Sequence, residues 1–346
     1  MAGAAIGTAA SAAESGNLPQ ARRIGAADSV DVRHYAGRSP AVAGANRIAG
    51  TVIVIATLLK WIVPWEFSWV FLAGFLLTCV LYLRGSRRRS VSFSRQLAFW
   101  TGMAIIYLSL HTYLDYYAEH EFFMHRIQQL LLHHLAPLLI VTAFPGTVLR
   151  AGMPLAWRVH VLQPLRRSWP WRIVSGVLLN PTVATLLFIG FIVIWLIPSM
   201  QTLAMLDWRI YRFMNWSMLI SGFAYWSLVL DHRPHPPGRM TTGLRVLSPA
   251  ITMTPQILAG AIITFSKTDL YPIFEICGRA FTFNVLTGQL IGGVIIWVPS
   301  ALLESIGGLM ALRQWLRLSR NGRLPRRPLR QHSAAAAARV NAGRPS

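Results

Sequence analysis

The sequence predicts an all-α protein: a polytopic bundle of about eight transmembrane helices with both termini in the cytoplasm. Three observations lead to this prediction. The 346-residue chain is 54% hydrophobic and only 13% charged, and its 33 Lys and Arg outnumber 12 Asp and Glu, for a net charge of +21. Sparse charge of one sign on an apolar chain is typical of a membrane protein with basic loops. It excludes a disordered chain, a secreted disulfide scaffold and an ordinary soluble enzyme.

Eight apolar runs are long enough to cross a bilayer, whose hydrocarbon core of about 30 Å needs roughly 20 apolar residues per helix. The first two are separated only by Pro64, Trp65 and Glu66, which predicts a tight helical hairpin. Prolines within later runs predict kinks or interruptions of the helices, because they remove a helical hydrogen bond. The runs lie at 47–65, 67–83, 96–115, 122–143, 173–198, 212–230, 244–265 and 283–304, and the prolines are Pro137, Pro181, Pro249 and Pro255.

The basic residues predict the orientation of these helices. Of the 33 Lys and Arg, 27 lie in the two tails and in the loops that follow the second, fourth and sixth runs. Cytoplasmic loops carry an excess of basic residues, so an even number of spans with both termini cytoplasmic fits this alternation. Most acidic residues fall in the opposite loops. The charge therefore describes topology and contact with membrane lipids, and we expect no nucleic-acid partner.

Composition divides the chain into three parts. Residues 1–46 are rich in Ala, Gly and Ser and contain no apolar core with a small-residue cleavage site, so we expect a disordered cytoplasmic tail and no signal peptide. Residues 47–318 form the transmembrane domain. Residues 319–346 are rich in Arg and Ala, which predicts a second disordered cytoplasmic tail, strongly basic in charge.

Polar residues inside a membrane span indicate function, because they are expensive to bury there. The run 122–143 contains His125, Gln129, His133 and His134. At 100° per residue, Gln129 and His133 lie about 40° and 80° from His125 and share its face, whereas His134 lies about 180° away. His125 and His133 are about 12 Å apart along the axis. That separation is too long for the two to bind one metal ion together.

A partner for His125 must come from another helix, and His111 is the best candidate. It lies about one turn before the end of the run 96–115, so an antiparallel hairpin would place it opposite His125 near the outer surface. Two imidazoles, with a thioether from Met124, Met214 or Met218, would suit copper. The alternative is hydrogen bonding across helices or to lipid head groups. The candidate metal ligands are His111, His125, His133 and His134; no cysteine pair offers a thiolate site.

Several motifs resemble those of a known family. The segment FFMHRIQQLLLHHLAPLLIVTAFPG resembles the signature helix of the CtaG family of cytochrome c oxidase assembly factors. Four further segments, in the family's order, are similar to its motifs: LYLRGSRR, WLIPSMQTLAM, DLYPIFE and QLIGGVIIW. The resemblance covers roughly residues 80–315. The chain has Gln129 where the signature has its second His, and Arg126 where it has Met.

The resemblance implies an assembly factor of the bacterial inner membrane, without catalytic turnover. Such a protein would bind copper transiently, or hold the oxidase subunit that carries the haem-copper centre ready to receive it. That subunit and membrane lipids are the expected partners, and a homo-oligomer is left open. Two alternatives remain. One is a haem-handling membrane enzyme with histidine axial ligands, and the other is an oxidase assembly scaffold that binds no metal.

Overall fold

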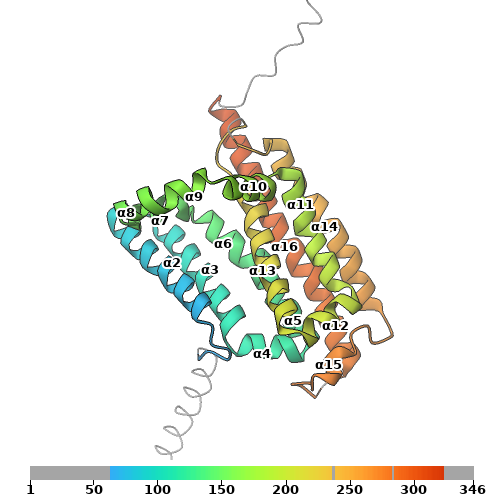
Figure 1. Cartoon of the computed structure of the whole chain (residues 1–346). Coiled ribbons are helices and arrows are strands. Elements are labelled where there is room, and N and C mark those ends of the chain that lie inside the picture. The colour runs from blue at the N-terminus through green and yellow to red at the C-terminus, as the bar shows by residue number, and fades with distance from the viewer. Residues whose placement is uncertain (1–62, 236–237, 283, 323–346) are drawn as a thin grey trace, which may run out of the picture. The chain divides into compact units, whose positions relative to one another are not determined.

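The computed structural model describes residues 63–235, 238–282 and 284–322, and within these ranges the chain is all helical, without strands (Figure 1). The predicted first span and both predicted tails lie largely outside the described residues. The helices are α2 Trp69–Arg88, α3 Phe93–His111, α4 Tyr113–His120, α5 Phe122–Leu130, the π-helical turn η2 Leu131–Leu135, α6 Ala136–Thr142, α7 Pro145–Gly152, α8 Leu155–Trp157, the π-helical turn η3 Arg158–Leu162, α9 Gln163–Arg167, α10 Trp169–Leu178, α11 Pro181–Leu196, α12 Pro198–Leu206, α13 Trp208–Val229, α14 Thr242–Phe265, α15 Ile273–Ile276 and α16 Val285–Arg320.

Three of these helices, α2, α14 and α16, are long and apolar enough to cross a membrane by themselves. Three more spans arise if each sharply bent helix pair is counted as one. The bends are 54° between α3 and α4, 69° between the helix 122–142 and α7, and 70° between α10 and α11. The described residues thus form a membrane-spanning helical protein with three to six spans by this measure. The full set of eight, and the position of the termini, stay predictions.

The predicted runs from 67 onward each coincide with helix. The run 173–198 is divided at Asn180, whose side chain caps α11 by accepting hydrogen bonds from the backbone of Thr182 (3.0 Å) and Val183 (3.4 Å). Pro181 at the first position of α11 then ends any continuation of α10, as predicted. By contrast, Pro249 and Pro255 lie within the continuous helix α14. The last helix is longer than predicted and extends to Arg320.

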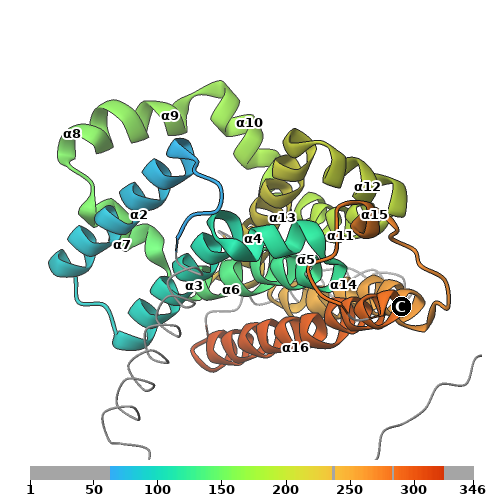
Figure 2. The same cartoon turned by 90° about the horizontal axis from the view of Figure 1, so that it is seen from below.

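Glycines set the closest helix contacts in the bundle. A Cβ atom on Gly293 of α16 would lie 2.7 Å from the backbone nitrogen of Thr264 on α14, so these two helices touch along their backbones. A Cβ atom on Gly222 of α13 would similarly lie 2.4 Å from the carbonyl oxygen of His133. Small residues at such crossings are typical of packing between membrane helices. Figure 2 shows α14 and α16 side by side, with α6 beside α3 and α5 beside α4.

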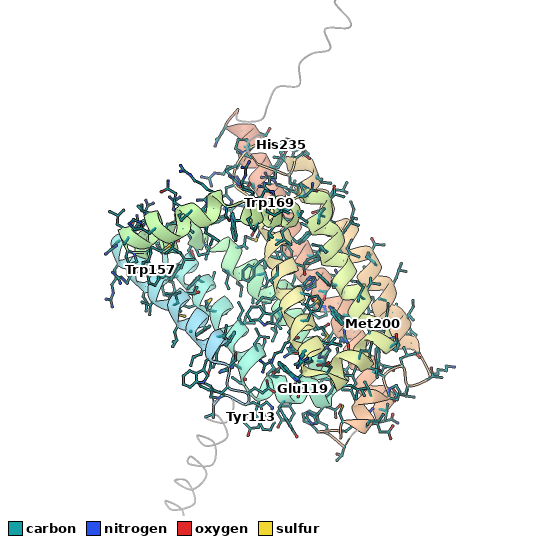
Figure 3. All side chains as sticks on the ribbon, viewed as in Figure 1. Tyr113, Glu119, Trp157, Trp169, Met200 and His235 are labelled. Carbon is teal, nitrogen blue, oxygen red and sulfur yellow. The ribbon has the colours of Figure 1, made fainter. Side chains whose placement is uncertain are left out.

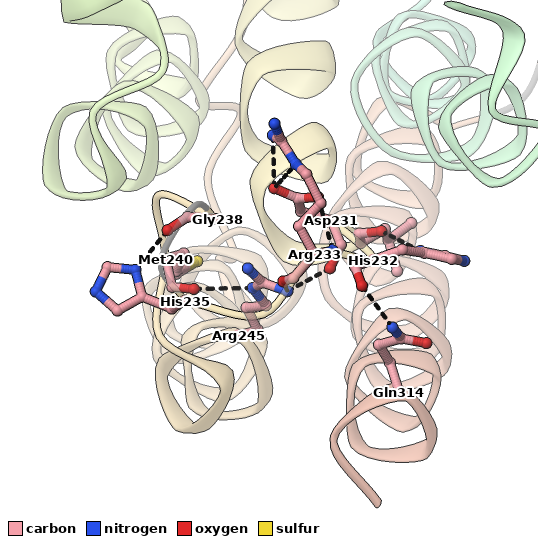
Figure 4. Close-up of polar contacts among 9 residues, drawn as sticks. Asp231, His232, Arg233, His235, Gly238, Met240, Arg245 and Gln314 are labelled. Atoms are coloured by element: carbon pink, nitrogen blue, oxygen red, sulfur yellow. Dashed lines mark hydrogen bonds and ion pairs between the residues drawn. The ribbon is translucent and has the colours of Figure 1, made fainter. Parts of the chain in front are cut away.

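The loop from α13 to α14 is held by one buried arginine (Figure 4). Arg245 is 2% exposed and donates to the carbonyls of Met240 and Arg233, both at 3.0 Å, and to that of Asp231. Burial raises the pKa of Asp231, but hydrogen bonds and charge from Arg233, with the charge of Arg245, outweigh it and lower that pKa below its ordinary value. His232 is exposed, and its Nδ1 atom lies 2.9 Å from the carbonyl oxygen of Leu230.

Candidate functional site

His111 ends α3 at the bend into α4. Thr112 makes the break: its hydroxyl donates to the carbonyl of Leu108 (2.7 Å) and caps α4 by accepting from the backbone of Leu114 (3.5 Å). The imidazole of His111 is 1% exposed. Its ring centroid lies 5.1 Å from that of Phe71 and 5.5 Å from that of Tyr107. Aromatic rings of α2 and α3 therefore fix this histidine at the end of the bundle where α4 lies.

A cavity of about 250 Å³ adjoins His111. The Nε2 atom of His111 and the Oδ1 atom of Asn215 are both buried and have no hydrogen-bond partner within the described residues. The amide oxygen is an acceptor, and so is the ring nitrogen in the tautomer protonated at Nδ1; a neutral imidazole nitrogen and an amide oxygen are both metal ligands. The ion pair of Glu66 and Arg212 (2.7 Å) is about half exposed on both sides. The lining residues are Glu66, Ser68, Val70, Phe71, Leu110, His111, Asp115, Tyr211, Arg212, Asn215 and Trp216.

Asp115 connects this cavity to the neighbouring helices. Its Oδ1 atom accepts from Gln128 Nε2 (2.5 Å) and from the hydroxyl of Tyr211 (2.7 Å). Gln128 also donates to the carbonyl of Ser109 (2.7 Å), so α3, α4, α5 and α13 meet at one carboxylate. The side chain is 6% exposed, and such a buried carboxylate is tolerated only when it is hydrogen-bonded. Figure 3 labels Tyr113 and Glu119, which mark α4 at this end of the bundle.

His125 lies one helical turn into α5 and is fully buried. Its Nε2 atom is 2.9 Å from the amide nitrogen of Gln129, whose oxygen accepts from Arg126 (2.9 Å). Arg126 also donates to Gln201 of α12 (2.5 Å), and its guanidinium lies 4.8 Å from the ring centre of Phe122. Within the described residues, this buried guanidinium contacts two side-chain amides, a backbone carbonyl and an aromatic ring. Gln129 thus joins the predicted ligand His125 to a buried cation.

His133 and His134 lie in the π-helical turn η2, where the wider turn places both rings in the interior. His133 Nε2 is 3.1 Å from Ser221 Oγ of α13. His134 Nε2 is 3.1 Å from Glu304 Oε1 of α16. The two rings lie against Phe188, with centroid distances of 4.0 and 5.2 Å. The close approach of Gly222 to the carbonyl of His133 brings Ser221 within reach.

Glu304 is the most informative residue that sequence reasoning missed. It is fully buried, and its two oxygens accept from His134, from Thr252 (2.7 Å) and from Gln256 of α14. The signal was available: Glu304 is the one carboxylate in the apolar run 283–304. Ionisable residues in membrane spans face the protein interior and pair there. Tyr211, Gln201 and Gln256 were also missed, because a single polar residue per helix says little without its partner.

The structure distributes the four predicted histidines over three settings. His111 lines a cavity, His125 contacts an amide, and His133 and His134 bond to Ser221 and Glu304. Tyr211 is the link between the first two, since it lines the cavity with His111 while its ring centroid lies 6.2 Å from that of His125. In the part of the chain that the structure describes, no three or more His, Cys, Asp or Glu side chains are grouped to hold a metal ion.

Fold and site together define a polytopic membrane protein whose helices enclose histidine, carboxylate and amide side chains. Residues 73–318 match the family model described as cytochrome c oxidase caa3 assembly factor (Caa3_CtaG), and the chain belongs to this family. The resemblance seen in the sequence motifs is thereby confirmed.

Two curated relatives are similar over a shared stretch. They are uncharacterized proteins of Mycobacterium bovis and Mycobacterium tuberculosis, each 23% identical over 274 residues. The aligned region is 76% of this chain but only 41% of each relative, so the chain spans less than half the length of these relatives. No solved structure matches the chain.

Proposed function

We propose that the protein assists assembly of cytochrome c oxidase in the bacterial inner membrane by carrying copper transiently to the subunit with the haem-copper centre. One observation supports this most: the buried Nε2 atom of His111 has no hydrogen-bond partner among the described residues and adjoins a cavity of about 250 Å³. In the proposed topology of eight spans with cytoplasmic termini, this cavity opens on the outer side. Copper is the cargo in this proposal, and the protein performs no catalytic turnover.

The chemistry of the cavity suits a cation that is held loosely. Imidazole accepts either copper oxidation state. Asp115 adds a carboxylate to the lining, whereas Glu66 is paired with Arg212. His111 is the first proposed ligand, because it needs to break no hydrogen bond at Nε2. His125, His133 and His134 are proposed as further ligands along the helix. Each has a contact at Nε2, and its Nδ1 atom has no hydrogen-bond partner among the described residues. An incomplete ligand set favours release, as a carrier requires.

Copper uptake by the purified protein tests this proposal. We expect the full-length protein in detergent to bind Cu(I) in competition with a chromogenic chelator, and His111→Ala to lose that binding. His160→Ala is the matched control, because His160 is exposed on η3 and lines no part of the cavity. Uptake that is unchanged in His111→Ala would contradict the assignment of this residue. A Soret band in the purified protein would favour the haem-handling alternative.

A deletion strain tests the role in the cell. Its oxidase should lack copper and retain haem, and a plasmid carrying the wild-type or His160→Ala gene should restore copper, whereas His111→Ala should not. If the oxidase is copper-replete in the deletion strain, the proposed function is wrong. If every histidine variant restores copper, the metal-free scaffold is the better account.

A further inference from the structure

A second polar cavity, lined by arginines, is formed where α2 ends, at α7 and η3. It measures about 400 Å³. Its lining contains four guanidinium groups and no carboxylate. The lining residues are Arg88, Arg89, Thr147, Arg150, Ala151 and Arg158. Four like charges around one cavity repel one another, so the arrangement favours an anion that neutralises them.

Backbone contact between α2 and α7 holds these arginines together. A Cβ atom on Gly85 would lie 2.0 Å from the carbonyl oxygen of Val148, and one on Gly152 would lie 1.8 Å from that of Leu81. The two helices therefore touch through glycines, one turn from Arg88 and two residues from Arg150. This packing fixes the backbone positions from which the arginine side chains reach the cavity.

The arginines differ in how far they are already used. Arg88 donates to the carbonyl of Ala151 (3.1 Å), and Arg158 donates to Met153 and Ala151, both at 3.1 Å. Within the described residues, the side chains of Arg89 and Arg150 make no hydrogen bond or ion pair. A free guanidinium fork matches the geometry of phosphate oxygens, and two forks beside one cavity form a phosphate-binding arrangement.

The neighbouring segment has the character of a membrane interface. From α8 through η3 to α9, exposed apolar side chains alternate with basic ones: Trp157 is 47% exposed and Val161 58%, and Arg166 and Arg167 follow. Trp157 and Trp169 are labelled in Figure 3, near the two ends of this segment. Amphipathic helices with tryptophan and arginine lie at the boundary of head groups and acyl chains. A phosphate in this cavity would thus lie where lipid head groups are found.

We propose that the arginine cavity binds the phosphodiester head group of an anionic phospholipid, with its acyl chains against the apolar side chains of α8, η3 and α9. The site is separate from the cavity of His111 and does not depend on the proposed function. It anchors the loop between the fourth and fifth predicted spans to one lipid class, beyond the general attraction of a basic surface to a membrane.

The test uses the full-length protein in lipid nanodiscs and native mass spectrometry. We expect phosphatidylglycerol to be retained in preference to phosphatidylcholine. Retention should fall by roughly tenfold or more in the double variant Arg89→Gln/Arg150→Gln, since each guanidinium that is removed loses charge-assisted hydrogen bonds to the phosphate. The matched control is Arg166→Gln/Arg167→Gln, with the same loss of charge on α9, and it should keep the preference.

Three results would overturn the proposal. They are equal retention of both lipids by the wild type, an equal loss in the two double variants, and binding of inorganic phosphate as tight as that of phosphatidylglycerol. The last would make the cavity a site for free phosphate. Thermal unfolding of the same samples shows whether each variant is folded; if Arg89→Gln/Arg150→Gln is not, Arg89→Lys/Arg150→Lys keeps the charge, loses the fork, and should show an intermediate preference.

Discussion

The cavity around His111 and the cluster around Glu304 contain the same kinds of side chain, a buried histidine and a buried carboxylate on neighbouring helices. They differ in what those side chains touch. Both oxygens of Glu304 accept hydrogen bonds, and the space beside His134 and Gln256 is only about 30 Å³. Each histidine has one ring nitrogen without a partner in the described structure, Nε2 of His111 and Nδ1 of His134, but the space that adjoins His111 is about 250 Å³.

This difference separates packing from binding. A buried polar group that is fully paired holds helices in one arrangement, and removing its partner leaves it unsatisfied at considerable cost. An unpaired group beside open space loses little when it is removed, but it is available to a ligand. Histidine in a membrane span is therefore not by itself evidence for a metal site. What distinguishes a binding histidine from a structural one is whether its ring adjoins open space or packed side chains.

The largest effect is expected at Glu304. Glu304→Ala leaves His134, Thr252 and Gln256 buried without their acceptor, so we expect the free energy of unfolding to fall by roughly 3–5 kcal/mol. Glu304→Gln keeps the shape and one acceptor oxygen and should lose about half as much. Thermal and denaturant unfolding in detergent measure both. A loss under about 1 kcal/mol in Glu304→Ala would show that this cluster does not hold α14, α16 and η2 together.

A smaller effect is expected at His111. In His111→Phe a ring replaces a ring, and no hydrogen bond of Nε2 is lost, so we expect the free energy of unfolding to stay within about 1 kcal/mol of the wild type. The same unfolding measurement checks this, beside the copper titration in which the variant should fail. Strong destabilisation by His111→Phe would show that His111, like Glu304, is a structural residue. The cavity around His111 and the cluster around Glu304 would then not differ in role.

The smallest effect is expected at Asp231, where the partner Arg233 is 63% exposed. The folded-state pKa of Asp231 lies below its ordinary value of 3.8. Its contribution is therefore present above the unfolded-state pKa and is lost as the pH falls through the lower, folded-state value. Asp231→Asn should destabilise by under about 1 kcal/mol at pH 7. The difference should shrink near pH 3; a difference that grows there would contradict the sign of the pKa shift.

The sequence predicted the helices well and their interior contacts poorly. Apolar runs identify spans because every residue contributes to the average, and the predicted break at Pro181 was confirmed because proline acts locally. Contacts such as His134 with Glu304 join residues 170 positions apart, and no periodicity shows which helix lies beside which. His111, predicted about one turn before the end of the run 96–115, is the last residue of α3 and is buried. Its copper ligation is a proposal that the experiments above decide.

The π-helical turn from Leu131 to Leu135 adds, in effect, one residue to a single turn of helix. One extra residue shifts the angular phase of everything beyond it by about 100°. The side chains of residues 122–130 and 136–142 therefore follow two different angular registers around one continuous helix. Deleting one residue, such as Leu131, would restore a common register and turn the packed face of α6 away from α3. The number of residues in this turn therefore determines which face of α6 packs against α3, just as the side chains themselves do.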